Sequence, residues 1–294
     1  MTETPPPTID PKAAARWQLR GVAESPWLHE EVALRMQQRL EWIKVQPASW
    51  INWQALSGGV KGHGLLLQRY PKSLCTVLEC GADNLTRAEQ TLLPSRWHPQ
   101  AWWQPRARVL PQIEQPAQML WCNMQLHMAH HPLTLMQRWH QALQVDGFLM
   151  FSCLGPDTLM ELRALYRSLD WPPPTHAYTD MHDWGDMLLA AGFAEPVMDM
   201  ERITLTFETP ERLLLELRGL GRNLQPDRFA GLRGRGWHRQ LLSALGQQPL
   251  QLTFEVIYGH AFKPAPRLAV GAQSAISLNE MRAALKLGAR GKDD

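Results

Sequence analysis

A short apolar segment near the middle of the chain constrains the fold more than any other stretch of the sequence. Residues 148–153 (Phe-Leu-Met-Phe-Ser-Cys) are almost wholly apolar, and the run is too short for a helix. Such a run is typical of a strand that is buried on both faces of a parallel sheet. Gly155 and Pro156 end the run, and Asp157 and Thr158 are expected to open an amphipathic helix behind it. This order predicts an open α/β sheet, in which ligands bind outside the carboxyl ends of the strands.

The rest of the chain first repeats this alternation and then departs from it. Strands are predicted at 74–78, 108–110, 118–122, 147–153, 196–207 and 252–262. Helices are predicted at 28–44, 84–93, 132–143, 157–169, 180–191 and 210–220. The last two strands are long and follow a Trp-Pro-Pro-Pro sequence at 171–174. We therefore predict an α/β fold with a mostly parallel sheet, helices on both faces and an antiparallel edge pair.

The composition narrows the class of protein. A formal net charge of +2 over 294 residues argues against a nucleic-acid-binding protein. No apolar run approaches the roughly 20 residues that cross a bilayer. Residues 1–12 hold four prolines and two acids and lack the basic-then-apolar order of a signal peptide. We expect residues 1–27 to be a disordered lead-in, residues 265–294 to be a tail, and the protein to be cytoplasmic.

Neither the cysteines nor the histidines predict a metal site. The cysteines are Cys75, Cys80, Cys122 and Cys153. Each lies in or beside a predicted strand and no Cys-x-x-Cys pair occurs, so we expect small buried side chains rather than zinc ligands or disulfides. His127, His130 and His131 have a helical spacing that suits a metal, but no acid or cysteine accompanies them.

A glycine-rich stretch at 57–64 is the first candidate site, between a short apolar segment and a helix. Glycines let a backbone approach a cofactor, and a helix N-terminus favours negative charge. Glu79 follows the next strand, about 20 residues on, where a carboxylate accepts hydrogen bonds from both hydroxyls of a ribose. Such turns and strand-end acids are also common without a ligand, so an ordinary turn remains the alternative.

Two further groups of polar residues are candidates for binding. Asn123 directly follows the strand at 118–122, where a side chain can face the pocket, although a loop asparagine bound to backbone is the alternative. Arginines recur with Trp237 and His238 among them, at Arg218, Arg222, Arg228, Arg233, Arg235 and Arg239. They suit a clamp on a carboxylate or a dock for an acidic partner, and a solvated helix surface is the alternative. No Ser/His/Asp or Cys/His arrangement stands out, so no catalytic residue is assigned.

Two motifs resemble one branch of the class I S-adenosylmethionine-dependent methyltransferases. They are Leu-Gly-Pro-Asp-Thr-Leu-x-Glu-Leu at 154–162, and Asp-Met-His-Asp-Trp-Gly-Asp-Met-Leu at 180–188 with Gly192-Phe193 behind it. Segments 196–199, 217–223 and 255–260 fit the same branch. The branch includes the malonyl-acyl-carrier-protein O-methyltransferases of biotin synthesis, and an assembly factor with the methyltransferase fold that hydroxylates an arginine.

The resemblance implies a Rossmann-like, seven-stranded sheet over residues 28–264, with helical substrate-side insertions at about 156–192 and 210–246. It also implies S-adenosyl-L-methionine as cofactor. The residues that match the family's cofactor contacts are Asn52, Ser57, Gly58, Gly59, Glu79 and Asn123. The family's first strand normally ends in an acid followed by alternating glycines, whereas this chain has Asn52 and Gln54 there. Because a lost charge-assisted contact costs about 1.5–3 kcal/mol, we expect weakened cofactor binding.

The resemblance further predicts methylation of the free carboxylate of a malonyl group carried by acyl carrier protein. That carboxylate is ionised at neutral pH, so no general base is needed. Arg218 or Arg222 is expected to hold it, with Asp157 on the substrate side, and the run from Arg228 to Arg239 is expected to dock the acidic carrier. For Asp157, capping of the following helix is the alternative. The alternatives for the whole chain are a binding or assembly protein with a degenerate cofactor loop, and a protein-arginine hydroxylase.

Overall fold

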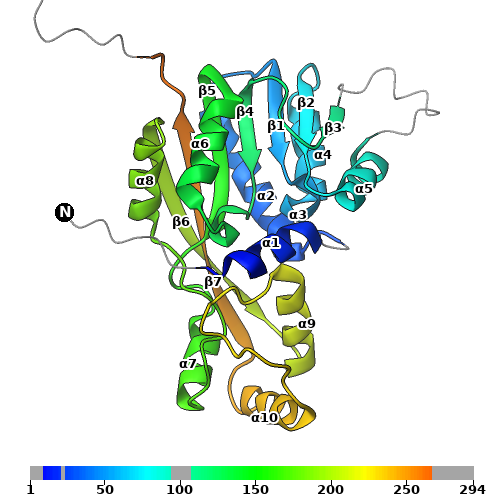
Figure 1. Ribbon diagram of the computed structural model, residues 1–294, viewed down its shortest axis with the longest axis vertical. Coiled ribbons are helices and arrows are strands. Elements are labelled where there is room, and N and C mark those ends of the chain that lie inside the picture. The colour runs from blue at the N-terminus through cyan, green and yellow to red at the C-terminus, as the bar shows by residue number, and fades with distance from the viewer. Residues whose placement is uncertain (1–8, 21–23, 94–106, 267–294) are drawn as a thin grey trace, which may run out of the picture. The chain divides into compact units, whose positions relative to one another are not determined.

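The centre of the fold is a seven-stranded mixed sheet, seen in a computed structural model that describes residues 9–20, 24–93 and 107–266 (Figure 1). The strands are β1 (Ser49–Trp53), β2 (Leu74–Leu78), β3 (Ala107–Leu110), β4 (Ala117–Cys122), β5 (Leu143–Leu154), β6 (Ala194–Thr206) and β7 (Gln251–Phe262). Their order is β3-β2-β1-β4-β5-β7-β6. β1 to β5 are parallel, and β7 is antiparallel to both of its neighbours. The predicted parallel sheet with an antiparallel edge pair is confirmed.

The apolar run at 148–153 lies in β5, between β4 and β7. Phe148 pairs with Met119 of β4 on one side and with Phe262 of β7 on the other. Every residue from position 147 to 154 is buried. Gly147 is needed there because a Cβ atom would stand 2.9 Å from the carbonyl oxygens of Gln118 and Gln144. The prediction of a strand buried on both faces is therefore confirmed.

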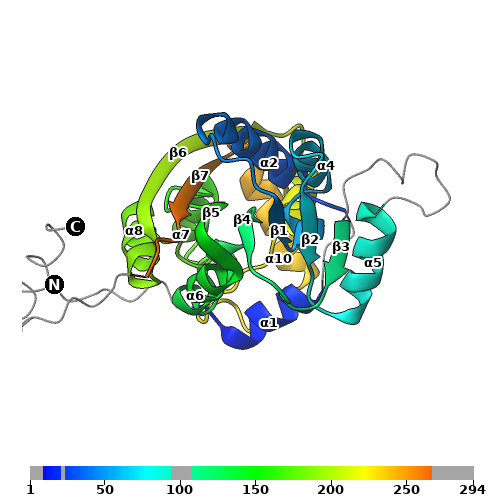
Figure 2. The ribbon, with the colours of Figure 1, turned by 90° about the horizontal axis from the view of Figure 1, so that it is seen from above.

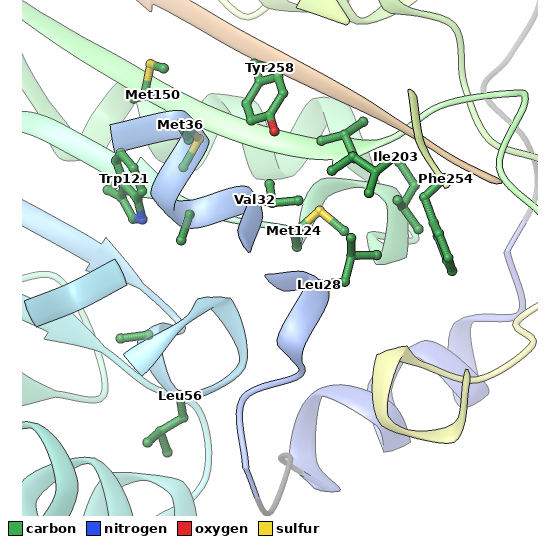
Figure 3. Close-up of a cluster of buried hydrophobic side chains, with 14 of the residues drawn as sticks. Leu28, Val32, Met36, Leu56, Trp121, Met124, Met150, Ile203, Phe254 and Tyr258 are labelled. Atoms are coloured by element: carbon green, nitrogen blue, oxygen red, sulfur yellow. The ribbon is translucent and has the colours of Figure 1, made fainter. Parts of the chain in front are cut away.

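Helices cover both faces of the sheet and create two apolar clusters. On one face lie α2 (Trp27–Arg39) and α4 (Val60–Arg69), and on the other lie α6 (Pro132–Ala142) and α8 (Met181–Ala190) (Figure 2). α5 (Ala82–Leu92) lies beside β3 at the edge of the sheet and adds Ala88 and Leu92 to the first cluster. In β4, Met119 and Trp121 join the first cluster, while Leu120 and Cys122 join the second. Figure 3 shows the first cluster, with side chains of α2 against Trp121 and Met150. Because successive strand residues point to opposite faces, two covered faces require the continuous apolar runs seen in the sequence.

Three further helices surround the far ends of β6 and β7, below the main sheet in Figure 1. They are α7 (Met160–Ser168), α9 (Pro210–Leu220) and α10 (Arg235–Leu245). β6 and β7 pair with each other along almost their whole length, and β5 reaches only as far as Val256 of β7. The two long strands therefore extend beyond the parallel sheet and carry these helices with them.

Three local expectations are wrong. A helix, α1 (Pro11–Arg20), lies within the stretch that was expected to be disordered. The predicted loop at 57–64 is largely helical, because α3 (Ala55–Gly58) and α4 occupy most of it. Asp157 and Thr158 do not open or cap α7, which begins at Met160 after Leu159 in the left-handed conformation. Thr158 instead exchanges hydrogen bonds of 3.2 Å with the backbone of Glu255 in β7.

Chain contacts divide the molecule into Met1–Pro264 and Ala265–Asp294, and residues 267–294 of the predicted tail lie outside the described residues. Within the described ranges, no helix is both long and apolar enough to cross a membrane. Cys75, Cys122 and Cys153 are buried, Cys80 is half-buried, and all four are free thiols.

Candidate cofactor and acceptor pockets

A pocket opens at the carboxyl ends of β1, β2 and β4, where the sequence predicts a ligand. We call it pocket A, and its lining includes Trp17, Trp53, Gln54, Ser57, Glu79 and Asn84. Trp53 ends β1, and Glu79 directly follows β2. The structure thus brings Ser57 and Glu79, two of the predicted site residues, to one pocket.

The turn after β1 keeps a glycine-like backbone without a glycine. Gln54 has φ 56° and ψ 58°, the left-handed conformation that glycine adopts most easily. Its N–H donates to the carbonyl oxygen of Leu78, at 2.8 Å, which fastens the turn to the end of β2. Leu56, at the next alternating position, donates its N–H to Oε1 of Glu79, at 2.9 Å. The turn therefore has a backbone conformation that suits glycine, and the side chains of Gln54 and Leu56 line the pocket wall.

Glu79 is a buried carboxyl group, only 3% exposed. Burial raises its pKa to about 7, against the opposing effects of the Leu56 N–H and the charge of Arg87. The group therefore changes between its acid and ionised forms near neutral pH. As a carboxylate it is an acceptor on the pocket wall.

Asn52 and Asn123 are buried and do not line pocket A. Nδ2 of Asn52 lies 3.0 Å from Nδ1 of His63 in α4. Burial lowers the pKa of His63 to about 4, so the imidazole is neutral and its Nδ1 accepts this hydrogen bond. Asn52 therefore joins β1 to α4 through a neutral pair.

Asn123 holds three segments together. Its Nδ2 donates to the carbonyl oxygen of His29, at 2.8 Å, and to that of Gly58. Its Oδ1 accepts from Oγ of Ser152 in β5, at 2.6 Å. A Cβ atom on Gly58 would stand 3.2 Å from the backbone oxygen of Asn123. The side chain thus fixes the position of the loop beneath pocket A rather than facing the pocket itself.

The N-terminus of α4 is occupied by a carboxylate of this chain. Gly59 precedes the helix with φ 130°, and Glu30 of α2 accepts hydrogen bonds from the N–H groups of Val60, Lys61 and Gly62 at 2.8, 3.0 and 3.1 Å. These are donors that a helix start leaves unpaired. The negative charge that the sequence led us to expect from a ligand is supplied by Glu30.

Replacing Glu30 by Gln is expected to lower the free energy of unfolding by about 1–2 kcal/mol, because the amide group turns one accepting oxygen into a donor that opposes the helix N–H groups. Thermal and urea unfolding measure this. Glu41→Gln, at an exposed glutamate, is the matched control. If both variants lost the same free energy of unfolding, the capping role of Glu30 would be contradicted.

A second pocket lies beside pocket A and shares Met128 with it. Its walls include Leu154, Leu217 and Phe254, with Arg222 among the polar residues, and we call it pocket B. The Arg222 guanidinium carbon lies 5.4 Å from the ring centre of Trp17, a residue of pocket A. A cationic group therefore stands at the junction of the two pockets.

The other predicted substrate residues do not line either pocket. Arg218 is exposed on α9, and its backbone oxygen accepts from Nη1 of Arg222 at 2.5 Å. Asp157 pairs with Arg202 at 2.5 Å on the surface. Of the three residues proposed for the acceptor, only Arg222 is placed at a pocket.

Pocket A also contains residues that the sequence did not single out. Asn84 is 4% exposed; its Nδ2 donates to the carbonyl oxygen of Cys80 at 2.9 Å, while its Oδ1 is buried without a partner among the described residues. Its place in the first turn of the helix after Glu79 was the available signal. Trp17 and Gln18 come from α1, where the only signal was the spacing of Ile9, Ala14 and Trp17. Within the described ranges, no cluster of His, Cys, Asp or Glu suits a metal ion.

Comparisons with known proteins agree on fold and family. No family model matches the chain. Proteins named malonyl-[acyl-carrier protein] O-methyltransferase are similar to it: that of Gallionella capsiferriformans is 37% identical and covers 84% of this chain and 88% of its own. That of Laribacter hongkongensis is also 37% identical, with 82% and 84% covered.

Solved structures are similar in fold. A Bacillus halodurans protein described as a putative methyltransferase has a TM-score of 0.52 at 13% identity, and covers 80% of this chain and 100% of its own. The YcgJ protein of Bacillus subtilis has the same TM-score at 11% identity, with 80% and 99% covered. The sheet order and these similarities establish a class I, Rossmann-like methyltransferase fold. With curated relatives more than 35% identical over most of its length, the chain belongs to the family of malonyl-[acyl-carrier protein] O-methyltransferases.

Proposed function

We propose that this protein transfers a methyl group from S-adenosyl-L-methionine to the free carboxylate of a malonyl thioester carried by acyl carrier protein, in the synthesis of a biotin precursor. The observation that carries the proposal is the position of Arg222, which lines pocket B and lies against a residue of pocket A. A guanidinium is the side chain best suited to hold a carboxylate, because it donates two parallel hydrogen bonds. The names of the relatives supply the substrate.

The residues of pocket A fit this cofactor. The carboxylate of Glu79 suits the hydroxyls of a ribose, and Oδ1 of Asn84, which has no partner among the described residues, suits an amino group of the base. Gln54 and Ser57 are the polar groups at the turn after β1 and would face the methionine end. When bound, the cofactor supplies an electrophilic methyl group on its sulfonium.

The protein's contribution to the reaction is alignment and exclusion of water. Arg222 holds the acceptor carboxylate, which is already ionised at neutral pH and needs no base. Leu154, Leu217 and Phe254 form an apolar wall around the rest of the acceptor. An oriented pair of reactants in a dry pocket removes much of the entropic barrier.

The carrier would dock on the segment from Arg228 to Arg239, which follows the pocket B residues Leu217 to Asn223 in the sequence. Arg228 forms an ion pair with Asp10, with 2.6 Å between Nη2 and Oδ2. The guanidinium carbon of Arg233 lies 3.9 Å from the ring centre of Phe229 and 4.6 Å from that of Trp237. Arg235 and Arg239 are exposed, as is Leu232, whose side chain is 99% exposed. Long-range attraction between these cations and an acidic carrier would speed association.

The proposal is tested by incubating the purified protein with S-adenosyl-L-methionine and malonyl-acyl carrier protein, and measuring the mass of the carrier. A gain of one methyl group that disappears on mild alkaline hydrolysis is expected. Absence of this ester, under conditions where the Gallionella relative forms it, would contradict the proposal. Calorimetry then separates the alternative: an assembly protein that has lost the cofactor gives no heat even at millimolar ligand. Asn52 and Gln54 favour this alternative, because they stand where the family has an acid and a glycine.

Cofactor affinity is expected to rise with pH through about 7. Glu79 has a raised pKa of about 7, and only its ionised form accepts from both ribose hydroxyls, so protonation competes with binding. Between pH 8 and pH 6 the dissociation constant of S-adenosylhomocysteine should increase about tenfold. Glu79→Gln should bind weakly and lose this pH dependence. A wild-type affinity that stays constant from pH 6 to pH 8 would contradict this role.

A further inference from the structure

Helix α1 forms part of the wall of pocket A. Trp17 and Gln18 line the pocket, and Cδ2 of Leu19 lies 3.7 Å from the place of a Cβ atom on Gly81, in the turn before α5. In Figure 1, α1 lies just beyond the carboxyl ends of β1 and β4, between the sheet and α9. The helix therefore covers the edge of the sheet where the cofactor is proposed to bind.

The segment after α9 holds α1 in place through contacts of different kinds. Oδ2 of Asp10 pairs with Nη2 of Arg228 at 2.6 Å, although the two residues are 218 positions apart. The N–H of Asp10 donates to the carbonyl oxygen of Leu224 at 2.9 Å. Arg222 lies over the ring of Trp17. An ion pair, a backbone hydrogen bond and a cation–π contact thus all come from residues 222–228.

A small apolar cluster completes this attachment. Ile9 and Ala14 are buried against Leu224 and Met128, with Trp17 partly buried at the edge. Met128 lines both pockets. The cluster is separate from the two clusters of the main sheet. The position of α1 therefore depends on a few contacts near the junction of the pockets and not on the core of the sheet.

We propose that α1 closes the cofactor pocket, with Trp17 in contact with the bound cofactor, and that Asp10, Arg222 and Arg228 are positioning residues that hold it closed. The inference rests on the proposed function, because the ligand of pocket A is the methyl donor. It also gives the substrate side a direct effect on the cofactor side. An acceptor carboxylate that fixes Arg222 fixes the ring of Trp17 as well, so each ligand would tighten the binding of the other.

The ion pair is tested by the affinity for S-adenosylhomocysteine, measured by calorimetry. Asp10→Asn keeps the oxygen that accepts from the N–H groups of Lys12 and Ala13, and replaces the oxygen that accepts from Arg228 with an uncharged NH2 group that cannot accept. Asp10→Asn and Arg228→Gln should each weaken binding by about two- to fivefold, and the double variant should be no weaker than either single one. Arg212→Gln, which removes an exposed pair with Glu216, is the matched control and should leave affinity unchanged.

The contact itself is tested at Trp17. Trp17→Ala should weaken binding of S-adenosylhomocysteine by about tenfold or more, because an aromatic wall is lost from the pocket. Trp27→Ala, at a tryptophan that is 55% exposed on α2, is the control. Melting temperatures of all variants show whether the sheet is still folded, since the cluster around α1 is separate from it.

Hydrogen exchange gives a readout that does not depend on catalysis. In the wild-type protein, S-adenosylhomocysteine should slow the exchange of the amides of α1, and Asp10→Asn should speed it without ligand while β4 and β5 stay protected. If the ligand binds but leaves α1 exchange unchanged, or if the variants bind like the wild type, the closing role is overturned and the proposed function stands. If the wild-type protein binds no S-adenosylhomocysteine, both are overturned.

Discussion

Replacing Arg222 by Gln should lower kcat/KM for malonyl-acyl carrier protein by about 10- to 100-fold. The variant loses a charge-assisted contact with the acceptor carboxylate, which is worth about 1.5–3 kcal/mol. Arg222→Lys should recover only part of this loss, because an ammonium cannot donate two parallel hydrogen bonds to one carboxylate. The rate of methyl ester formation measures the effect, at saturating S-adenosyl-L-methionine so that any change in cofactor affinity is removed.

Arg218→Gln is the matched control on the same side of the fold. Its side chain is exposed and lines neither pocket, so its kcat/KM should stay within about twofold of the wild type. A binding experiment separates recognition from catalysis. The wild type should prefer a malonyl thioester over an acetyl thioester, and Arg222→Gln should lose that preference. If Arg218→Gln shows the larger defect, the assignment of the carboxylate to Arg222 is wrong.

Replacing Asn123 by Asp should lower the free energy of unfolding by about 3–5 kcal/mol. Nδ2 of Asn123 donates to two buried carbonyl oxygens, those of His29 and Gly58, and a carboxylate would place an acceptor against both. A buried group left without its partner costs about 1–3 kcal/mol, and a buried charge costs more. Urea unfolding measures the loss.

The matched variant is Asn223→Asp. In the wild-type protein, Nδ2 of Asn223 donates to the carbonyl oxygen of Pro173, and this hydrogen bond is exposed. The substitution should cost less than about 1 kcal/mol, because water replaces the lost partner. Asn123 was also a candidate cofactor contact. If Asn123→Asp keeps its stability but loses affinity for S-adenosylhomocysteine, that candidate role is correct and the structural role is not.

The sequence predicts the sheet well because the pattern of a doubly covered strand is local. In β5 and β4, apolar residues fill successive positions, and glycine or proline marks the ends. The same property places Glu79 and Asn123 at the carboxyl edge, since each directly follows a strand. A side chain's direction at a strand end is a different matter. Glu79 lines the pocket, whereas Asn52 and Asn123 face inward. The inward direction is set by hydrogen bonds to residues outside the strand, which are His63 for Asn52, and Gly58 and Ser152 for Asn123.

Contacts between distant parts of the chain account for what was missed. Helix α1 has only two large apolar residues, Trp17 and Leu19, and resembles a disordered lead-in until Leu224 and Arg228 are placed against it. Thr158 resembles a helix cap, but its hydroxyl is bound to the backbone of Glu255 from a strand almost a hundred residues later. The N-terminus of α4 is capped by Glu30, which comes from another helix. None of these pairings has a signature within a short window of sequence.

The carboxylate of Glu30 also affects which ligand groups the start of α4 can bind. In dinucleotide-binding sheets the diphosphate lies at the N-terminus of the helix that follows the first strand. Here that terminus already carries a negative charge, held by three backbone N–H groups. A phosphate at the same place would meet like charge and find the helix donors taken. The start of α4 is therefore a poor place for the diphosphate of a nicotinamide or flavin dinucleotide.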